Sequence, residues 1–136
     1  MKKISLLLAT ISLITACIPI EKEIQLMPID YLTAGQTKTW KLTQFKNAGT
    51  DQLVDCLKDD TFTFRKKEGK YEWSKGESKC YTEDTDAVFD FKLNTDGSTL
   101  IINEYEYKVN RLDISTLEIE IVLNGHTQIL TYSKIE

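Results

Sequence analysis

One stretch of the sequence decides how the folded part of the chain is built: Cys56-Leu57-Lys58-Asp59-Asp60-Thr61-Phe62-Thr63-Phe64. Its first half is polar and typical of a corner between two elements. Its second half, residues 61–64, alternates a hydroxyl with an aromatic ring, and this period of two predicts a half-buried β-strand. A second cysteine, Cys80, follows after Gly76. A bond between the two cysteines would pin the start of this strand to the far end of the next hairpin.

The N-terminal residues have the features of an export signal. Lys2 and Lys3 precede an apolar run at residues 4–14, which is shorter than the roughly 20 residues that span a bilayer and fits a signal peptide. The residues Leu13-Ile14-Thr15-Ala16-Cys17 resemble the lipobox of bacterial lipoproteins, in which a lipidated cysteine becomes the first residue of the mature chain. We expect residues 1–16 to be a lipoprotein signal peptide and Cys17 to carry lipid. An ordinary signal peptide, cleaved at a small residue, is the alternative.

Export changes the interpretation of the other two cysteines. Disulfides form and persist outside the cytoplasm, and a lipidated Cys17 leaves only Cys56 and Cys80 of the three cysteines in the chain. We predict that these two are bonded, which the chain-entropy model rates at on the order of 3.5 kcal/mol for a loop of this length. Two free, buried cysteines are the alternative.

Length and composition limit the classes of function. A chain of 136 residues, 41% hydrophobic and 28% charged, can bury one core. Its formal net charge of -4 disfavours nucleic acid as a partner, because that affinity depends on Lys and Arg neutralising phosphates. One histidine and the lack of a Cys-x-x-Cys pair leave few of the usual zinc ligands. We therefore expect neither a metal nor a cofactor.

The mature chain divides into a tether and a single domain. Residues 17–36 lack sustained periodicity and contain both prolines, which predicts a lipidated N-terminus and tether, with at most a helical turn at residues 30–34. From Trp40 onward, short alternating runs are separated by turn signals, of which Asn124-Gly125 is the strongest. The strands predicted from these runs are 39–46, 60–66, 70–75, 87–93, 99–103, 104–110, 116–123 and 127–134.

The number and order of these runs indicate the fold. Eight sequential antiparallel strands remove their exposed edges most economically by closing into an up-and-down barrel. We therefore predict an all-β fold, an eight-stranded antiparallel up-and-down β-barrel with one disulfide, over residues 37–136. In the first strand, alternation places Trp40, Leu42 and Gln44 on one face.

Four pieces of the sequence together match a known family. They are Thr39–Thr43 on the first strand, Cys56–Asp60 before the aromatic strand, Cys80 after a glycine-bearing hairpin, and Leu112–Leu117 entering the penultimate strand. In this combination the chain resembles the lipocalin-like lipoproteins of Gram-negative bacteria, over about residues 37–135. The resemblance implies a lipocalin-like (calycin-like) barrel, lipid-anchored in the outer membrane on its periplasmic or surface-exposed face. It implies no catalytic residues. The Gly-x-Trp of larger lipocalins is absent, since Gly35 lies five positions before Trp40.

Any small-molecule function would lie inside the barrel. The alternation places nine aromatic residues on the interior face as candidate ligand-binding residues: Trp40, Phe62, Phe64, Tyr71, Trp73, Phe89, Phe91, Tyr105 and Tyr107. Because such rings bury about 150–250 Å² each, we expect a largely filled interior with at most a shallow pocket at one mouth. Binding of a partner by exposed loops is then favoured over lipid transport.

Several functions remain open at this stage. The leading one is a non-catalytic, monomeric envelope lipoprotein that binds a small apolar ligand or a partner protein. A small hydrolase or isomerase using Asp59, Asp60 or His126 is the alternative, and a structural surface protein without a ligand is a third. We expect Asp59 and Asp60 to cap the corner by accepting backbone N–H groups. His126, beside a hairpin turn, is expected to be exposed.

Overall fold

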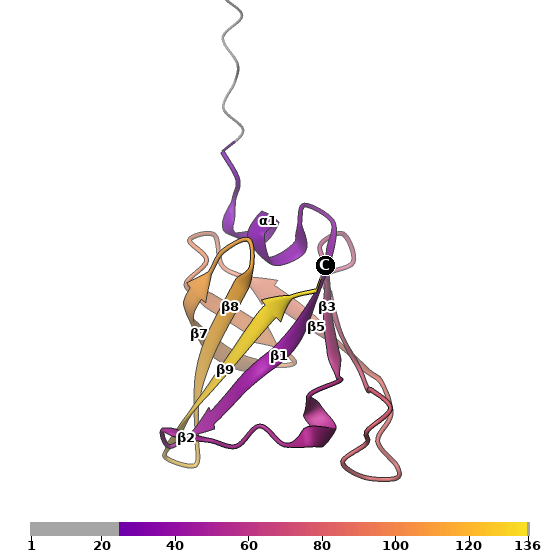
Figure 1. Cartoon of the computed structure of the whole chain (residues 1–136). Coiled ribbons are helices and arrows are strands. Elements are labelled where there is room, and N and C mark those ends of the chain that lie inside the picture. Colours follow the sequence, from indigo (N-terminus) through magenta and orange to yellow (C-terminus); the bar gives the residue numbers. More distant parts are fainter. Residues whose placement is uncertain (1–24, 136) are drawn as a thin grey trace, which may run out of the picture.

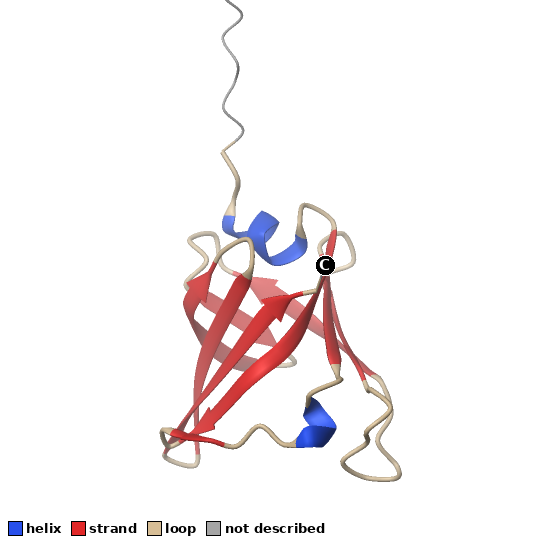
Figure 2. Ribbon diagram, viewed as in Figure 1, coloured by secondary structure: helices blue, strands red, loops and turns tan. Residues whose placement is uncertain are grey.

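The computed structural model describes residues 25–135, so the predictions for residues 1–16 and for Cys17 lie outside the described part of the chain. The structure is one antiparallel sheet that closes on itself as a barrel, with a short helix across one end (Figures 1 and 2). Between residues 25 and 135, no helix has the length and apolar character needed to cross a bilayer.

The strands follow one another around the barrel in chain order. Each pairs with its neighbours, and β1 also pairs with β9, which closes the sheet and leaves no free edge in the wall. The two-residue strand β2 pairs only with the end of β1, so eight strands form the wall, as predicted. The elements are α1 (Pro28–Thr33), β1 (Thr37–Asn47), β2 (Thr50–Asp51), the 3₁₀ helix η1 (Asp55–Leu57), β3 (Thr61–Arg65), β4 (Lys70–Ser74), β5 (Ala87–Leu93), β6 (Thr99–Ile102), β7 (Tyr105–Leu112), β8 (Thr116–Leu123) and β9 (His126–Lys134).

The turns of the barrel fall into two sets, one at each end. The turns β3–β4, β5–β6 and β7–β8 lie at the end that carries α1, which we call the closed end (Figure 1). The connections β1–β3, β4–β5, β6–β7 and β8–β9 lie at the opposite end, called the open end. The chain enters β1 from the closed end and returns there at the end of β9.

A bulge in β1 changes which side chains face inward. The pairing of β1 with β9 shifts register between Leu42 and Gln44. Leu42 and Phe45 lie opposite Tyr132 and Leu130, and all four line the interior, whereas Gln44 lies opposite Thr131. The prediction that Gln44 shares the inner face with Trp40 is therefore wrong, because the extra residue of the bulge reverses the alternation beyond it.

The helix α1 lies in the segment predicted as a tether, and the structure places it in the barrel domain. Pro28 is its first residue, where a missing N–H costs nothing, and the Asp30 carboxylate accepts the Met27 N–H at 3.1 Å. Leu32 is fully buried in the barrel core. The domain therefore begins at or before Pro28 rather than at residue 37, because the barrel needs this helix to cover its end.

Two side chains of β1 fasten the helix to the closed end. Trp40 Nε1 donates to the Leu32 carbonyl at 3.0 Å. Lys38 is buried, and its ammonium donates to the carbonyls of Tyr31 at 2.7 Å and Ile114 at 2.8 Å while lying 3.9 Å from the centre of the Trp40 ring. Burial lowers the pKa of Lys38, with a further contribution from Lys134. The closed end is thus sealed by apolar packing and by satisfied polar groups.

Candidate functional site

The open half of the barrel contains a cavity of about 320 Å³. Each of the eight wall strands contributes at least one inward-facing side chain to the cavity lining, and η1 contributes Leu57. Most of these side chains are aliphatic or aromatic, so the walls are apolar. The lining residues are Leu42, Phe45, Leu57, Phe62, Tyr71, Trp73, Phe89, Ile102, Asn103, Tyr105, Tyr107, Ile119, Ile121, Gln128, Leu130 and Tyr132.

The cavity lies only in the open half because the closed half is filled. Trp40, Phe64, Leu100 and Leu117 are almost completely buried beneath α1, together with Leu32. Within residues 25–135, no α-helix covers the open end of the barrel. The short 3₁₀ helix η1 lies near this opening. The barrel therefore has one sealed end and one mouth.

The predicted filling of the whole interior is wrong for this open half. Several neighbouring rings stack along the wall: the ring centres of Phe62 and Trp73 are 5.7 Å apart at an interplanar angle of 29°, and those of Tyr71 and Phe89 are 6.2 Å apart at 27°. Phe62 also meets Tyr132 edge to face, with ring centres 5.1 Å apart. Rings that lie face to face on adjacent strands cover one another, so their buried areas do not add up to filled volume. The remaining space is larger than the shallow pocket that ring area alone predicted.

The structure divides the nine predicted aromatic residues into two groups. Six line the cavity: Phe62, Tyr71, Trp73, Phe89, Tyr105 and Tyr107. Trp40, Phe64 and Phe91 belong to the filled part, where Phe91 meets Phe64 edge to face at 5.0 Å. Tyr105 is 53% exposed and stands at the rim, because it is the first residue of β7 after the turn.

Several lining residues were not among the sequence candidates. Ile119, Ile121 and Tyr132 lie on β8 and β9, and the alternation of these two strands indicates that they face inward. Phe45 was hidden by the bulge in β1. Leu57 comes from a 3₁₀ helix that carries no periodic signal, so pattern alone could not find it.

Three of the tyrosine side chains that line the cavity have a perturbed hydroxyl pKa. Burial, and then the neighbouring Tyr132 and Tyr107, raises the pKa of Tyr71 well above its ordinary value. Burial also raises the pKa of Tyr132 strongly, although the interaction with the Tyr71 hydroxyl lowers it in part. Burial raises the pKa of Tyr107. The three phenols are therefore neutral at physiological pH and offer uncharged hydrogen-bonding groups.

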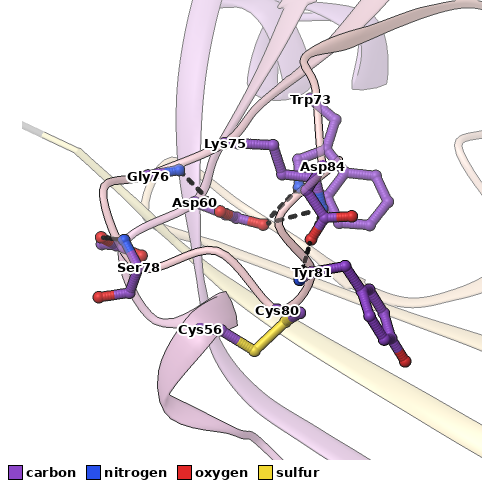
Figure 3. The surroundings of a disulfide bond; sticks show 10 residues. Cys56, Asp60, Trp73, Lys75, Gly76, Ser78, Cys80, Tyr81 and Asp84 are labelled. Carbon is purple, nitrogen blue, oxygen red and sulfur yellow. Dashed lines mark hydrogen bonds and ion pairs between the residues drawn. A yellow bond between two sulfur atoms is a disulfide. The ribbon is translucent and has the colours of Figure 1, made fainter.

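Asp60 fixes one wall of the cavity. This carboxylate is 0% exposed; one oxygen accepts Trp73 Nε1 at 2.7 Å and the other accepts the Gly76 N–H at 2.8 Å (Figure 3). The Lys75 ammonium lies 3.5 Å from the same carboxylate and 3.5 Å from the centre of the Trp73 ring. Asp60 thereby holds the indole that lines the cavity, as a positioning residue.

The disulfide holds the mouth of the barrel. Cys56 and Cys80 are bonded, as predicted, with their Cα atoms 5.0 Å apart. The bond joins η1, which supplies Leu57 to the cavity, to the loop between β4 and β5 (Figure 3). Asp59 accepts the Ser78 N–H of that loop at 3.0 Å. Asp59 and Asp60 therefore accept backbone N–H groups, as predicted, but these groups belong to the β4–β5 loop and not to the corner itself.

The residues of the alternative catalytic hypothesis are not joined in the structure. His126 is exposed at the first position of β9, opposite Leu123 across the turn. Within residues 25–135, no hydrogen bond or ion pair connects His126 with Asp59 or Asp60. The same part of the chain contains no group of three or more His, Cys, Asp or Glu placed to hold a metal ion.

Comparison with known proteins gives one positive finding. The sequence profile of a family described as a lipocalin-like domain matches residues 37–119. This range begins at β1 and ends within β8, so it includes most of the barrel wall and most of the cavity lining. No curated protein matches the chain.

Proposed function

Because this chain belongs to the lipocalin-like domain family, we propose that its barrel binds a small, mainly apolar ligand in the open-end cavity, without catalysis. The observation that carries the proposal is the cavity itself, whose volume of about 320 Å³ lies at the lower end of the roughly 300–1,000 Å³ of ligand pockets. Its occupant would displace on the order of ten water molecules. Each 100 Å² of apolar ligand surface removed from water contributes about 2.5 kcal/mol before the costs of binding.

The tyrosines narrow the chemistry of the ligand. Tyr71, Tyr107 and Tyr132 place neutral hydroxyls in a mainly apolar cavity. The remaining polar side chains of the lining are also uncharged: Asn103, Tyr105 and Gln128. A hydroxyl, carbonyl or amide of the ligand can hydrogen-bond with them, whereas a buried ionic group would lack a countercharge and would be costly. We therefore favour a ligand with an apolar body and one uncharged polar group at its inner end.

A fluorescent apolar probe tests the proposed site. The uncharged fluorescent probe N-phenyl-1-naphthylamine, titrated into the folded protein, should bind saturably, with one molecule per chain. Ile121→Trp should weaken this binding at least tenfold, because Ile121 is 8% exposed and lines the cavity. Val122→Trp is the matched control, since the adjacent Val122 is 62% exposed on the outer face. Equal binding by the two variants would place the probe outside the cavity and contradict the proposal.

We propose further that lipid on Cys17 anchors the barrel, as a monomer, in the outer membrane on its periplasmic or surface-exposed side. Support comes from the sequence before Cys17 and from the disulfide, which is typical of proteins outside the cytoplasm. Several acyl chains anchor far more firmly than one, at about 0.8 kcal/mol per buried methylene. In a Gram-negative host, Cys17→Ser should move the protein to the soluble fraction. Retention in the membrane fraction equal to that of the parent would contradict a lipid anchor.

A further inference from the structure

The closed end of the barrel carries a cluster of exposed apolar side chains that the barrel itself does not use. Leu26 and Met27 lie just before α1 and are half exposed, Ile114 in the β7–β8 turn is 70% exposed, and Ile135 follows β9. Leu26, Ile114 and Ile135 line one surface groove, although they come from three separate segments of the chain. Apolar side chains gathered in this way mark an interaction surface.

We propose that this closed-end surface lies against the lipid bilayer, so that the cavity mouth points away from the membrane. The proposal rests on the lipid anchor at Cys17 proposed above. It assigns a partner, the bilayer surface, to the groove between Leu26, Ile114 and Ile135. It also determines that the ligand enters the cavity from the aqueous side.

The length of chain before the barrel supports this orientation. Leu26 lies nine positions after Cys17, and a chain of nine steps reaches at most about 30 Å when fully extended. The chain joins the barrel at the closed end (Figure 1). Strand β1 has 11 residues, or about 36 Å along its length, and a tilt of about 40° leaves a barrel roughly 28 Å tall. Only a fully extended connection could bring the open end to the bilayer, whereas any shorter span brings the closed end there.

The distribution of charge agrees with the same orientation. The connections at the open end, with the strand residues that border them, contain nine acidic side chains and three lysines. The corresponding residues of the closed end, together with α1 and the last residue of β9, contain five basic and four acidic side chains. Both Lys67 and Lys134 are exposed there. An anionic leaflet attracts lysines close to its surface and repels carboxylates. Electrostatics therefore favours contact through the closed end and disfavours contact through the open end.

Quenching by brominated lipid tests this orientation in the full, lipidated chain. The protein is reconstituted into vesicles of phosphatidylethanolamine and phosphatidylglycerol whose acyl chains are brominated, and tryptophan emission is compared with that in unbrominated vesicles. The two variants Ile114→Trp, at the closed end, and His126→Trp, at the open end, each add one indole at an exposed position. The parent, with Trp40 and Trp73 alone, gives the background.

We expect at least half of the added emission of Ile114→Trp to be quenched and that of His126→Trp to remain. Quenching of His126→Trp alone, of both indoles equally, or of neither while the protein still floats with the vesicles would overturn the orientation and leave the anchor intact. Flotation of the protein with the vesicles tests the lipid anchor separately. Parent protein that fails to float would contradict the lipid on Cys17 and, with it, the proposed orientation.

Discussion

Asp60 shows at the scale of a residue how the cavity wall is held. Its carboxylate is buried yet accepts two N–H groups and lies next to a lysine, so every partner would lose its bond if the side chain were removed. Neighbouring Asp59 makes a single backbone bond of this kind, to Ser78. The losses of stability on replacing Asp59 and Asp60 can therefore be compared directly, since the two carboxylates are adjacent and differ in burial and in number of partners.

Asp60→Ala should destabilise the fold by about 3–5 kcal/mol, the usual cost of removing one partner of a buried charge pair. Asp59→Ala should cost about 1 kcal/mol, the value of a typical hydrogen bond. Urea denaturation of both variants measures the difference. Equal losses would show that Asp60 is not the support of the Trp73 wall.

From the raised pKa of the buried tyrosines we predict how the free energy of unfolding depends on pH. Burial raises the pKa of Tyr132 in the folded chain, while in the unfolded chain it returns to about 10. Below pH 10 the hydroxyl is protonated in both states, so stability does not change through this group. Above pH 10 the unfolded chain loses the proton first, and stability falls by up to about 1.4 kcal/mol per pH unit until the folded pKa is reached.

Urea denaturation at pH 8, 10 and 11 checks this dependence. The loss of stability between pH 8 and pH 11 should be smaller in Tyr132→Phe than in the parent, because the variant lacks one buried phenol. The same loss in both proteins would show that Tyr132 does not keep its proton in the folded state.

At the scale of elements, the helix α1 depends on a close approach to the β5–β6 turn. Gly97 has a φ of +76°, and a Cβ placed there would lie 2.6 Å from the Cβ of Pro28. Gly125 has nearly the same φ, +77°, with no atom within 4 Å of such a Cβ. An alanine would bring similar backbone strain at either position, and only at residue 97 would it also clash with the helix.

Gly97→Ala should therefore lose more stability than Gly125→Ala, by about 1–3 kcal/mol for the overpacking against Pro28. Thermal or urea denaturation of the two variants gives the difference directly. Similar losses would indicate that α1 moves freely and does not seal the closed end.

The disulfide is the second element-scale feature that can be measured. Cys56→Ala and Cys80→Ala should each lose on the order of 3.5 kcal/mol. The double variant should cost little more than either single one, since both changes remove the same bond. Fully additive losses would mean that the two sulfurs act independently.

Most elements could be predicted from local alternation, and the exceptions have physical reasons. β5 and β8 have the predicted bounds because their alternation is uninterrupted. Phe45 was missed because a bulge contributes a residue that no local pattern reveals. A helical turn was predicted at residues 30–34, but the packing of α1 on the barrel was not, because six residues give too little periodicity and the helix is stabilised by the burial of Leu32 in the barrel core.

At the scale of the whole molecule, closure was predictable and the cavity was not. Eight alternating runs in sequence predict a closed barrel, because closure pairs the first strand with the last and leaves no exposed strand edge. The pairing of β1 with β9 is this closure. The free volume depends on how Phe62, Trp73, Tyr71 and Phe89 stack along the wall, and composition does not contain that geometry. The two ends of the barrel therefore differ: the closed end is sealed and is the proposed membrane contact, and the open end carries the mouth of the cavity.

Native mass spectrometry of the protein purified from its own host tests most directly whether the cavity holds a ligand. The parent and Val122→Trp should each retain one small molecule per chain. Ile121→Trp should be free of it, because the larger ring occupies space inside the cavity that Ile121 lines. A parent without any retained molecule, or the same molecule retained equally by Ile121→Trp, would contradict ligand binding in the barrel.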